Sequence, residues 1–282
     1  MSGFAARDGG AVRDDGPVRR TVSADLTLEV QTPGDLVLSI APAGTPGADI
    51  DERLAVTLDG RPVVADELRD VHGTRLHRVT VDVGLLTVRY EGMVLGRAAE
   101  PGAEKHELIH YLRPSRYCES DTLAPTAAAE FGGLDGIDLL DAVSSWVGTR
   151  LEYVAGSSLS TDGAVSTLLA RRGVCRDYAH LCVALLRARG MPARQVSVYA
   201  PGLVPMDFHA VCEAYVDGRW LVVDATALAP RASMLRIATG RDAADTAFLT
   251  TLSGYAELVG IEVTAVVDVL PSDDLTTPVQ LG

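Results

Sequence analysis

The segment from Val174 to Arg189 is the feature that most restricts the fold of this chain. Apolar side chains occupy almost the whole circumference of this segment when it is drawn as a helix, including the run 181–186. A helix without a polar face has to be buried. Gly190 and Pro192 follow directly, and such residues commonly end a helix. The sequence therefore predicts a buried helix over residues 174–189.

Short strand-like runs separated by turn residues fill the chain from residue 21 to about residue 98. Asp59-Gly60 separates two of the runs, and an Asp-Gly pair in this position is a strong hairpin signal. About six or seven short strands at this spacing predict a small antiparallel β-sandwich. The runs are Thr27–Gln31, Asp35–Ile40, Leu54–Leu58, Pro62–Val64, His77–Val83 and Leu86–Tyr90.

Helical spacing replaces the strand pattern after residue 123, and strands return after the buried helix. The later strands are expected at Arg194–Tyr199, Ala210–Val216, Trp220–Val223 and Gly260–Val269. Helices that precede strands, rather than alternating with them, favour the α+β class. We therefore expect an α+β protein with four segments: a disordered arm (1–20), an N-terminal antiparallel β-sandwich domain (21–98), an α+β core domain (99–272) and a C-terminal tail (273–282).

Charge and hydropathy restrict the partners of the chain. Its formal net charge of −13 disfavours binding to nucleic acid and to anionic membranes. No apolar run reaches the roughly 18 residues of a membrane span. The polar, Gly-rich first twenty residues lack the apolar centre of a secretory signal. We therefore expect a cytoplasmic protein without nucleic-acid or membrane partners, and the sequence leaves its oligomeric state open.

One of the four cysteines lies where it could act as a nucleophile. Cys118, Cys182 and Cys212 form no C-x-x-C pair with Cys175 or with one another, which argues against a structural zinc site. Cys182 and Cys212 lie in apolar runs and are expected to be small buried hydrophobes. Cys175 starts the buried helix, where the helix dipole favours a thiolate and backbone N–H groups can stabilise an oxyanion. We take Cys175 as the candidate nucleophile.

A histidine and an aspartate on two later strands can complete this site. His209 begins one strand-like run, Asp224 ends the next, and Asp217-Gly218 forms a tight turn between them. An antiparallel hairpin would bring the two side chains together within a residue or two. Asp224 could then orient the imidazole of His209, which would act as the base for Cys175. The spacing therefore predicts a Cys-His-Asp triad.

Three further polar residues near the buried helix need an interpretation. Tyr153 could donate a hydrogen bond to an oxyanion, or it could be a packing tyrosine with a satisfied hydroxyl. Asp177 could position the site, but capping the first helical turn is the favoured interpretation. His180 lies about 140° around the helix from Cys175 and is expected to be structural.

The motif Gly173-Val-Cys-Arg-Asp-Tyr-Ala-His180, followed by His209-Ala210 and Asp224-Ala-Thr226, resembles that of the transglutaminase-like superfamily of papain-type enzymes. The segments Tyr111–Asp121 and Met234–Phe248 also resemble bacterial members. The resemblance implies a transglutaminase-like core over residues 99–272, preceded by the β domain that the family often carries. It also implies that Cys175 is the nucleophile, His209 the base and Asp224 the orienting residue, without a cofactor.

The same resemblance implies a peptide or protein substrate with an amide group, and a thioester on Cys175. Resolution of the thioester by an amine is transamidation, and resolution by water is hydrolysis. We favour a peptidase or amidase, because bacterial relatives are often regarded as peptidases. Many relatives carry Trp where this chain has Val211 and Pro where it has Ala225. Neither departure removes a triad atom, and both bear on substrate preference.

Two alternatives to this function stay open. His106-Glu-Leu-Ile-His110 matches the H-E-x-x-H pattern of zinc peptidases, in which a helix places two histidines on one face. Pro101 and Pro114 leave a helix of only about ten residues there, and the third ligand would have to be Glu119 or Glu130. We therefore predict that this motif binds no metal. The other alternative is a non-catalytic binding domain of the same fold, although such domains usually lose a triad member.

Overall fold

The computed structural model describes residues 18–99 and 102–282 of the chain. Most of the arm expected over residues 1–20 therefore lies outside the described residues. Its last two residues, Arg19 and Arg20, contradict the expectation, because they begin the first strand. The side chain of Arg20 is fully buried and donates hydrogen bonds to the carbonyl oxygens of Met234, Gly282 and Gly96.

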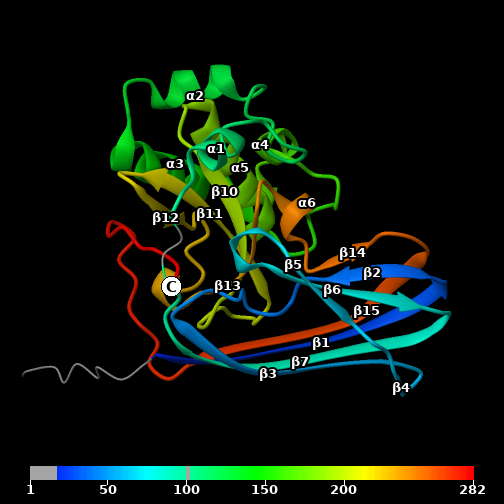
Figure 1. The fold of residues 1–282 in the computed structure, drawn as a ribbon. Coiled ribbons are helices and arrows are strands. Elements are labelled where there is room, and N and C mark those ends of the chain that lie inside the picture. The colour runs from blue at the N-terminus through cyan, green and yellow to red at the C-terminus, as the bar shows by residue number, and fades with distance from the viewer. Residues whose placement is uncertain (1–17, 100–101) are drawn as a thin grey trace, which may run out of the picture.

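Two antiparallel sheets form the sandwich that the sequence predicts, and they lie at the lower side of the molecule in Figure 1. One sheet has the strand order β15-β1-β7-β3-β4, and the other has the order β14-β2-β6-β5. A shared core of buried apolar side chains lies between them. The strands are β1 (Arg19–Thr32), β2 (Gly34–Leu38), β3 (Ala48–Leu58), β4 (Arg61–Pro62), β5 (Asp66–Arg69), β6 (Arg75–Val81), β7 (Gly84–Gly96), β14 (Leu249–Thr251) and β15 (Tyr255–Val267).

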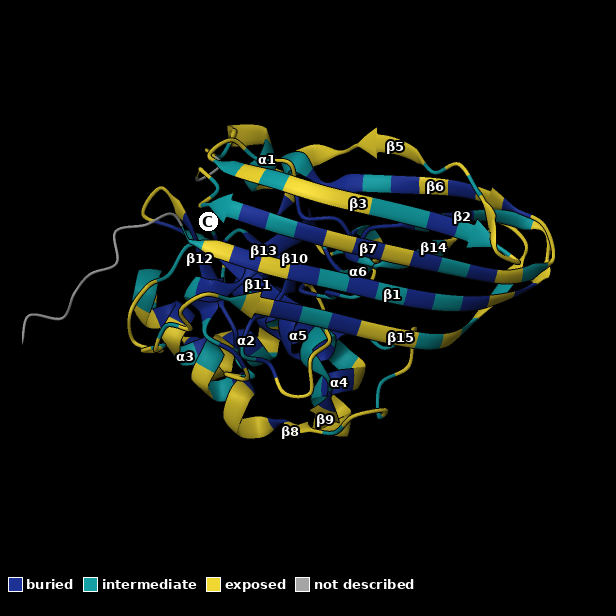
Figure 2. Ribbon diagram, turned by 90° about the horizontal axis from the view of Figure 1, so that it is seen from below, coloured by how far each residue is buried: buried dark blue, intermediate teal, exposed yellow. Residues whose placement is uncertain are grey.

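Strand alternation explains why this part of the chain forms a sandwich. In β1, Val22, Ala24, Leu26 and Leu28 are buried while the residues between them are partly or fully exposed. Successive side chains of a strand point to opposite faces, so one face of β1 supplies the core and the other meets water. The buried and exposed bands along β1, β7 and β15 are visible in Figure 2.

The last strand, β15, belongs to the sandwich and not to the second domain. The sequence predicts the strand Gly260–Val269 within the second domain, but β15 pairs antiparallel with β1, with Leu26 opposite Ile261. Likewise, β14 pairs with β2. The alternating pattern specifies which face of a strand is buried but not which strand lies beside it. The chain therefore returns to the sandwich after the second layer is complete.

Helices and a four-stranded antiparallel sheet, in the order β12-β11-β10-β13, form the upper part of the molecule in Figure 1. Together with the sandwich they give the expected α+β architecture. The helices are α1 (Lys105–His110), α2 (Ala124–Phe131), α3 (Gly136–Arg150), α4 (Ala164–Ala170), α5 (Cys175–Ala188) and α6 (Ala243–Thr246), with short 3-10 turns at Val71–Gly73 and Arg231–Ser233. The strands are β8 (Glu152–Tyr153), β9 (Arg172–Gly173), β10 (Ala193–Tyr199), β11 (Phe208–Val216), β12 (Arg219–Val223) and β13 (Leu235–Gly240).

Helix α5 is the buried helix that the sequence predicts. It packs on β10 and β11 and is covered by α2, α3 and α4. Every residue from Asp177 to Arg187 is buried. Each fully buried leucine contributes about 1.5–3 kcal/mol relative to an exposed one, so the apolar run 181–186 holds the helix firmly in place. Within the part of the chain that the structure describes, no helix is long and apolar enough to cross a membrane.

Buried charges tie the four-stranded sheet together. Glu213 on β11 accepts hydrogen bonds from Arg194 on β10 at 2.8 Å and from Arg236 on β13 at 2.6 Å. Burial raises the pKa of Glu213, but the two guanidinium groups outweigh it and lower the pKa to about 2. Arg194 also lies 3.8 Å from the ring centroid of Trp220. Removal of one member of such a buried pair would cost about 3–5 kcal/mol.

The C-terminal tail, residues 273–282, packs against this sheet and is hydrogen-bonded to it. Arg231 pairs with Asp273 at 2.9 Å, and the backbone N–H of Val222 donates to the carbonyl oxygen of Val279 at 2.8 Å. Leu281 is buried against the sheet. The tail therefore covers β12 and belongs to the packed structure.

The return of the chain to the sandwich can be tested at Gly34. A Cβ atom at this position would lie 2.0 Å from the carbonyl oxygen of Ser253, in the turn between β14 and β15. Because backbone must move to relieve this overlap, we expect Gly34→Ala to lower the free energy of unfolding by about 1–3 kcal/mol in urea denaturation. Gly102→Ala is the matched control, because a Cβ there meets no atom within 4 Å. Equal stability of the two variants would contradict this packing.

Candidate active site

The β11–β12 hairpin brings His209 and Asp224 together, as the sequence predicts. Asp217 and Gly218 form its turn with φ angles of 50° and 83°, and Cys212 lies opposite Val223. The Nε2 atom of His209 lies 2.9 Å from Oδ2 of Asp224, and both side chains are buried.

The other oxygen of the Asp224 carboxylate is held from the chain that follows it. Its Oδ1 accepts hydrogen bonds from the backbone N–H of Thr226 at 3.0 Å and from the hydroxyl of Thr226 at 2.7 Å. With both oxygens bonded, the carboxylate cannot rotate freely. The imidazole that it contacts is therefore fixed in orientation.

Asp224 also determines the charge of His209. Burial by itself lowers the pKa of His209, but the charge of Asp224, its hydrogen bond and the nearby Cys175 thiol outweigh burial and raise the pKa to about 10. Burial acts to raise the pKa of Asp224, whereas the charge of His209 and the hydrogen bonds lower it overall. The two residues therefore form a buried imidazolium–carboxylate pair at neutral pH.

Cys175 is the first residue of α5 and is half-buried. The turn before it is very tight: a Cβ atom on Gly173 would lie 2.7 Å from Cβ of Asp177. Asp177 folds back over this turn, and its Oδ2 accepts a hydrogen bond from the backbone N–H of Val174 at 2.9 Å. Capping, the favoured interpretation of Asp177, is therefore observed. It leaves the sulfur at the open end of the helix.

Cys175 and His209 line the same pocket, which has a volume of about 820 Å³. Asp224 occupies Nε2 of His209, so Nδ1 is the remaining ring nitrogen, and it is buried without a hydrogen-bond partner among the described residues. The Cys175 thiol lies close enough to contribute to the raised pKa of His209, although no hydrogen bond of standard geometry joins them in the described structure. The fold thus brings the three predicted residues to one site.

Tyr153 lies beside Cys175. Burial and the Cys175 thiol raise the pKa of Tyr153, and a hydrogen bond with the Cys175 backbone opposes them, giving a pKa of about 12. The hydroxyl therefore keeps its proton at neutral pH. The side chain is 43% exposed, so it is not a buried packing tyrosine.

His180 is structural, as expected, and it supports the helix α6, which lines one side of the pocket. Its Nε2 atom accepts a hydrogen bond from the backbone N–H of Ala243 at 3.1 Å, and its ring stacks on Tyr117. Burial lowers the pKa of His180 to about 3, so the ring is neutral and able to accept this bond. Ala243 begins α6, and α6 lines the pocket. His180 therefore fixes the position of α6.

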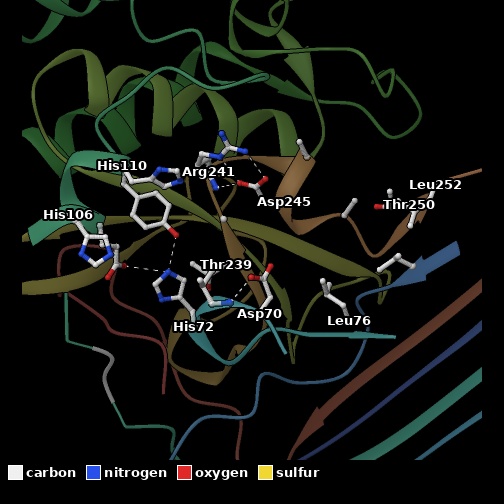
Figure 3. Close-up of a pocket in the computed structure, with 17 residues that line it drawn as sticks. Asp70, His72, Leu76, His106, His110, Thr239, Arg241, Asp245, Thr250 and Leu252 are labelled. Atoms are coloured by element: carbon white, nitrogen blue, oxygen red, sulfur yellow. Dashed lines mark hydrogen bonds and ion pairs between the residues drawn. The ribbon is translucent and has the colours of Figure 1, made fainter. Parts of the chain in front are cut away.

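The H-E-x-x-H segment forms α1, which has only six residues and borders a second cavity of about 520 Å³. His106 and His110 lie on that cavity with His72 (Figure 3). Glu107, which would be the base of a zinc peptidase, instead accepts a hydrogen bond from Arg194 at 3.0 Å and lies 3.4 Å from His72. The segment thus joins the helical layer to the buried charges of the sheet.

Neither of the expected third zinc ligands lies at this motif. Glu119 accepts a hydrogen bond from the backbone N–H of Ala164 at the start of α4, and Glu130 accepts one from Trp146. Over residues 18–99 and 102–282, no three His, Cys, Asp or Glu side chains are grouped so that they could hold a metal ion. The arrangement of these residues therefore gives no support to zinc chemistry.

Several polar residues that line the pocket were not predicted from the sequence. Gln195 and Ser197 are polar residues in β10, whose residues are all buried, and this contrast is a signal that could have been used. Ser39 comes from the sandwich, directly after β2, and nothing in its local sequence marks it. The sandwich therefore contributes to a site that the sequence predicts in the second domain alone.

Comparison with known proteins supports this architecture. Residues 125–225 match the model of a family described as the transglutaminase-like superfamily. The crystal structure of a "Putative Cysteine Protease" from Cytophaga hutchinsonii aligns with a TM-score of 0.82 and 33% identity over 94% of each chain. This likeness therefore covers both the sandwich and the helical layer.

Curated relatives match over shorter stretches. An uncharacterised protein of Mycobacterium leprae is 29% identical over 114 residues, which are 38% of this chain and 41% of the relative. An uncharacterised protein of Mycobacterium tuberculosis is 41% identical over 63 residues, which are 22% of this chain and 20% of the relative. The matched stretches thus span less than half the length of these relatives.

The ion pair between His209 and Asp224 makes stability depend on pH. The pKa of His209 rises from 6.5 to about 10 on folding, so its contribution is complete below pH 6.5 and is lost as the pH rises through about 10. The lowered pKa of Asp224 adds stability above 3.8 that is lost as the pH falls through its folded value.

We therefore expect the stability difference between wild type and Asp224→Asn, measured by urea denaturation, to shrink between about pH 7 and about pH 10.5. Asp273→Asn is the matched control, because Asp273 pairs with an arginine, Arg231, and not with a histidine. Its stability difference should stay constant over the same range. A constant difference for Asp224→Asn would contradict the charged pair.

The four thiols should differ in reactivity. Burial raises the pKa of Cys118, Cys182 and Cys212, and all three are fully enclosed. We expect iodoacetamide at neutral pH to alkylate Cys175 first, because its sulfur lies at a pocket and a helix N-terminus. Peptide mapping over time measures the four rates, and His209→Ala should slow the alkylation of Cys175. Modification of a buried cysteine ahead of Cys175 would contradict the assignment.

Proposed function

Because this chain belongs to the transglutaminase-like superfamily, we propose that it is a cysteine enzyme that cleaves amide or peptide bonds through a thioester on Cys175. The convergence of Cys175 and the His209–Asp224 pair on one pocket carries the proposal. The 33% identity to a structure named a cysteine protease, over 94% of both chains, supports hydrolysis as the outcome.

The first half of the reaction forms the thioester. The Cys175 sulfur, as a thiolate, bonds to the carbonyl carbon of the amide, and the carbonyl oxygen takes the negative charge. Backbone N–H groups at the start of α5 and the protonated hydroxyl of Tyr153 would stabilise this oxyanion. His209 donates its Nδ1 proton to the leaving nitrogen as the C–N bond breaks. An amine departs and the acyl group stays on sulfur.

The second half releases the acyl group. Neutral His209 takes a proton from a water molecule at Nδ1, and the water oxygen attacks the thioester carbonyl. The C–S bond breaks, a carboxylic acid leaves, and the thiolate–imidazolium pair forms again. Asp224 holds Nε2 throughout, which keeps Nδ1 directed to the reacting atoms and stabilises the imidazolium. An amine in place of water would give transamidation by the same route.

Trapping of the acyl-enzyme tests the proposal directly. Wild-type protein is quenched in acid during turnover of a blocked peptide mixture, and the adduct is located by mass spectrometry. We expect an acyl group on Cys175, and one ¹⁸O atom in the released acid when the reaction is run in H₂¹⁸O. A product joined to an added amine in place of the acid would overturn hydrolysis. Turnover without any adduct on Cys175 would overturn the thioester.

Substitution of the three residues should give graded losses. Cys175→Ala is expected to abolish turnover, and His209→Ala to come close, because the first removes the nucleophile and the second the proton donor. Asp224→Ala removes only orientation, and we expect a loss of roughly 10²-fold or more in kcat/KM. Cys212→Ala makes the same chemical change as Cys175→Ala in the core and should keep turnover. Full activity of Asp224→Ala would show that another acceptor orients His209.

A further inference from the structure

The pocket beside Cys175 gathers buried polar atoms that lack partners. Among the described residues, twelve buried side-chain nitrogen or oxygen atoms make no hydrogen bond, and five of them belong to residues that line this pocket. The five atoms are Ser39 Oγ, Arg176 Nε, Gln195 Oε1, Ser197 Oγ and His209 Nδ1. None belongs to the lining of the second cavity, beside α1. A buried polar atom without a partner costs about 1–3 kcal/mol, so such a cluster needs an explanation.

Three of these residues form one neutral patch, which we call the polar floor: Ser39, Gln195 and Ser197. Their exposed fractions are only 2%, 2% and 9%. Gln195 and Ser197 lie two residues apart on β10 and therefore share one face of the strand. Ser39 approaches from the sandwich, where its backbone N–H donates to the carbonyl oxygen of Phe248. Serine hydroxyls turn by rotation about χ1, so both can meet a ligand in the pocket.

Gln195 lies beside His180. The Gln195 side chain opposes the effect of burial on the pKa of His180, which places the amide beside the ring. The ring in turn is fixed by its bond to Ala243. The Gln195 amide thus lies beside a fixed ring and lines the pocket.

The buried and half-buried charges that line the pocket already have partners, because Arg176 pairs with Asp177 at 3.3 Å and His209 pairs with Asp224 at 2.9 Å. Arg116 and Asp207 are exposed residues of the lining. The Nη2 atom of Arg176 is already bonded to the hydroxyl of Ser158 and to the carbonyl oxygen of Leu159. Phe208 and Phe248, whose rings stack 5.0 Å apart, supply apolar walls. The floor itself therefore offers hydrogen bonds without charge, beside these apolar walls.

We propose that the polar floor selects peptides with an uncharged hydrogen-bonding side chain, such as that of asparagine, next to the amide presented to Cys175. This inference rests on the proposed function, because it assigns the substrate of the same pocket. Hydroxyl and amide groups of the floor can both donate to and accept from such a side chain. A carboxylate would lose its hydration without gaining a buried cation that is free of an anionic partner, and an apolar side chain would leave the floor unpaired.

Binding without turnover tests the floor. The probes are blocked alanine hexapeptides in which one position at a time carries Asn, Asp or Leu, three side chains of similar size. Their affinities for the Cys175→Ala protein are measured by calorimetry. At one position we expect Asn to bind at least about tenfold more tightly than both Asp and Leu. Ser39→Ala or Ser197→Ala, added to Cys175→Ala, should each reduce this preference to less than about threefold.

Ser233→Ala is the matched control. Ser233 is equally buried, but its hydroxyl bonds to the carbonyl oxygens of Pro201 and Pro230 outside the pocket. The preference for Asn should survive this change. Equal binding of Asn, Asp and Leu at every position would overturn the floor's role, as would a preference that persists in both Ser39→Ala and Ser197→Ala. Failure of the thioester chemistry shows separately, as selective binding of the Asn peptide with no acyl adduct on Cys175 in the wild-type protein.

Discussion

The burial of helix α5 is the constraint on which the rest of this structure depends. A helix that is apolar on nearly every side has to be enclosed, and β10, β11, α2, α3 and α4 enclose it. Enclosure fixes the helix N-terminus relative to the start of β11. Cys175 and His209 are therefore held by packing and not by a bond between them. The tight turn at Gly173, closed by Asp177, then leaves the sulfur at the pocket.

Buried charges stabilise this frame at a few points where they are fully paired. Glu213 has two guanidinium partners, and Asp224 has His209 and Thr226. Both carboxylates keep a lowered pKa despite burial, because each is surrounded by donors. The polar floor differs, since its atoms are buried with partners missing. The two buried carboxylates of the frame are thus fully paired, whereas the polar floor, where we propose that a substrate binds, is not.

The sandwich shares its core and part of the pocket with the helical layer. Its core continues into Tyr199, Leu235 and Ile237 of the four-stranded sheet, and Ser39 and β14 line the pocket. Strand β15 follows the four-stranded sheet in the chain and pairs with β1 of the sandwich. The chain itself therefore joins the two parts, in addition to their packing. Removal of the sandwich would therefore be expected to open the pocket, and the two parts are best regarded as one structural unit around the site.

Features that depend on neighbouring residues can be predicted from the sequence alone. The ends of α5, the cap at Asp177 and the hairpin that joins His209 to Asp224 involve at most about fifteen residues, and local patterns of polarity and turn residues specify them. Contacts between distant segments can be seen only in the folded protein. There β15 pairs with β1, Glu107 belongs to a buried charge cluster, and Ser39 lines the same pocket as residues of β10. These contacts join residues far apart in the chain. The period of a strand or helix records which face is buried, but it carries no information about which distant segment covers that face.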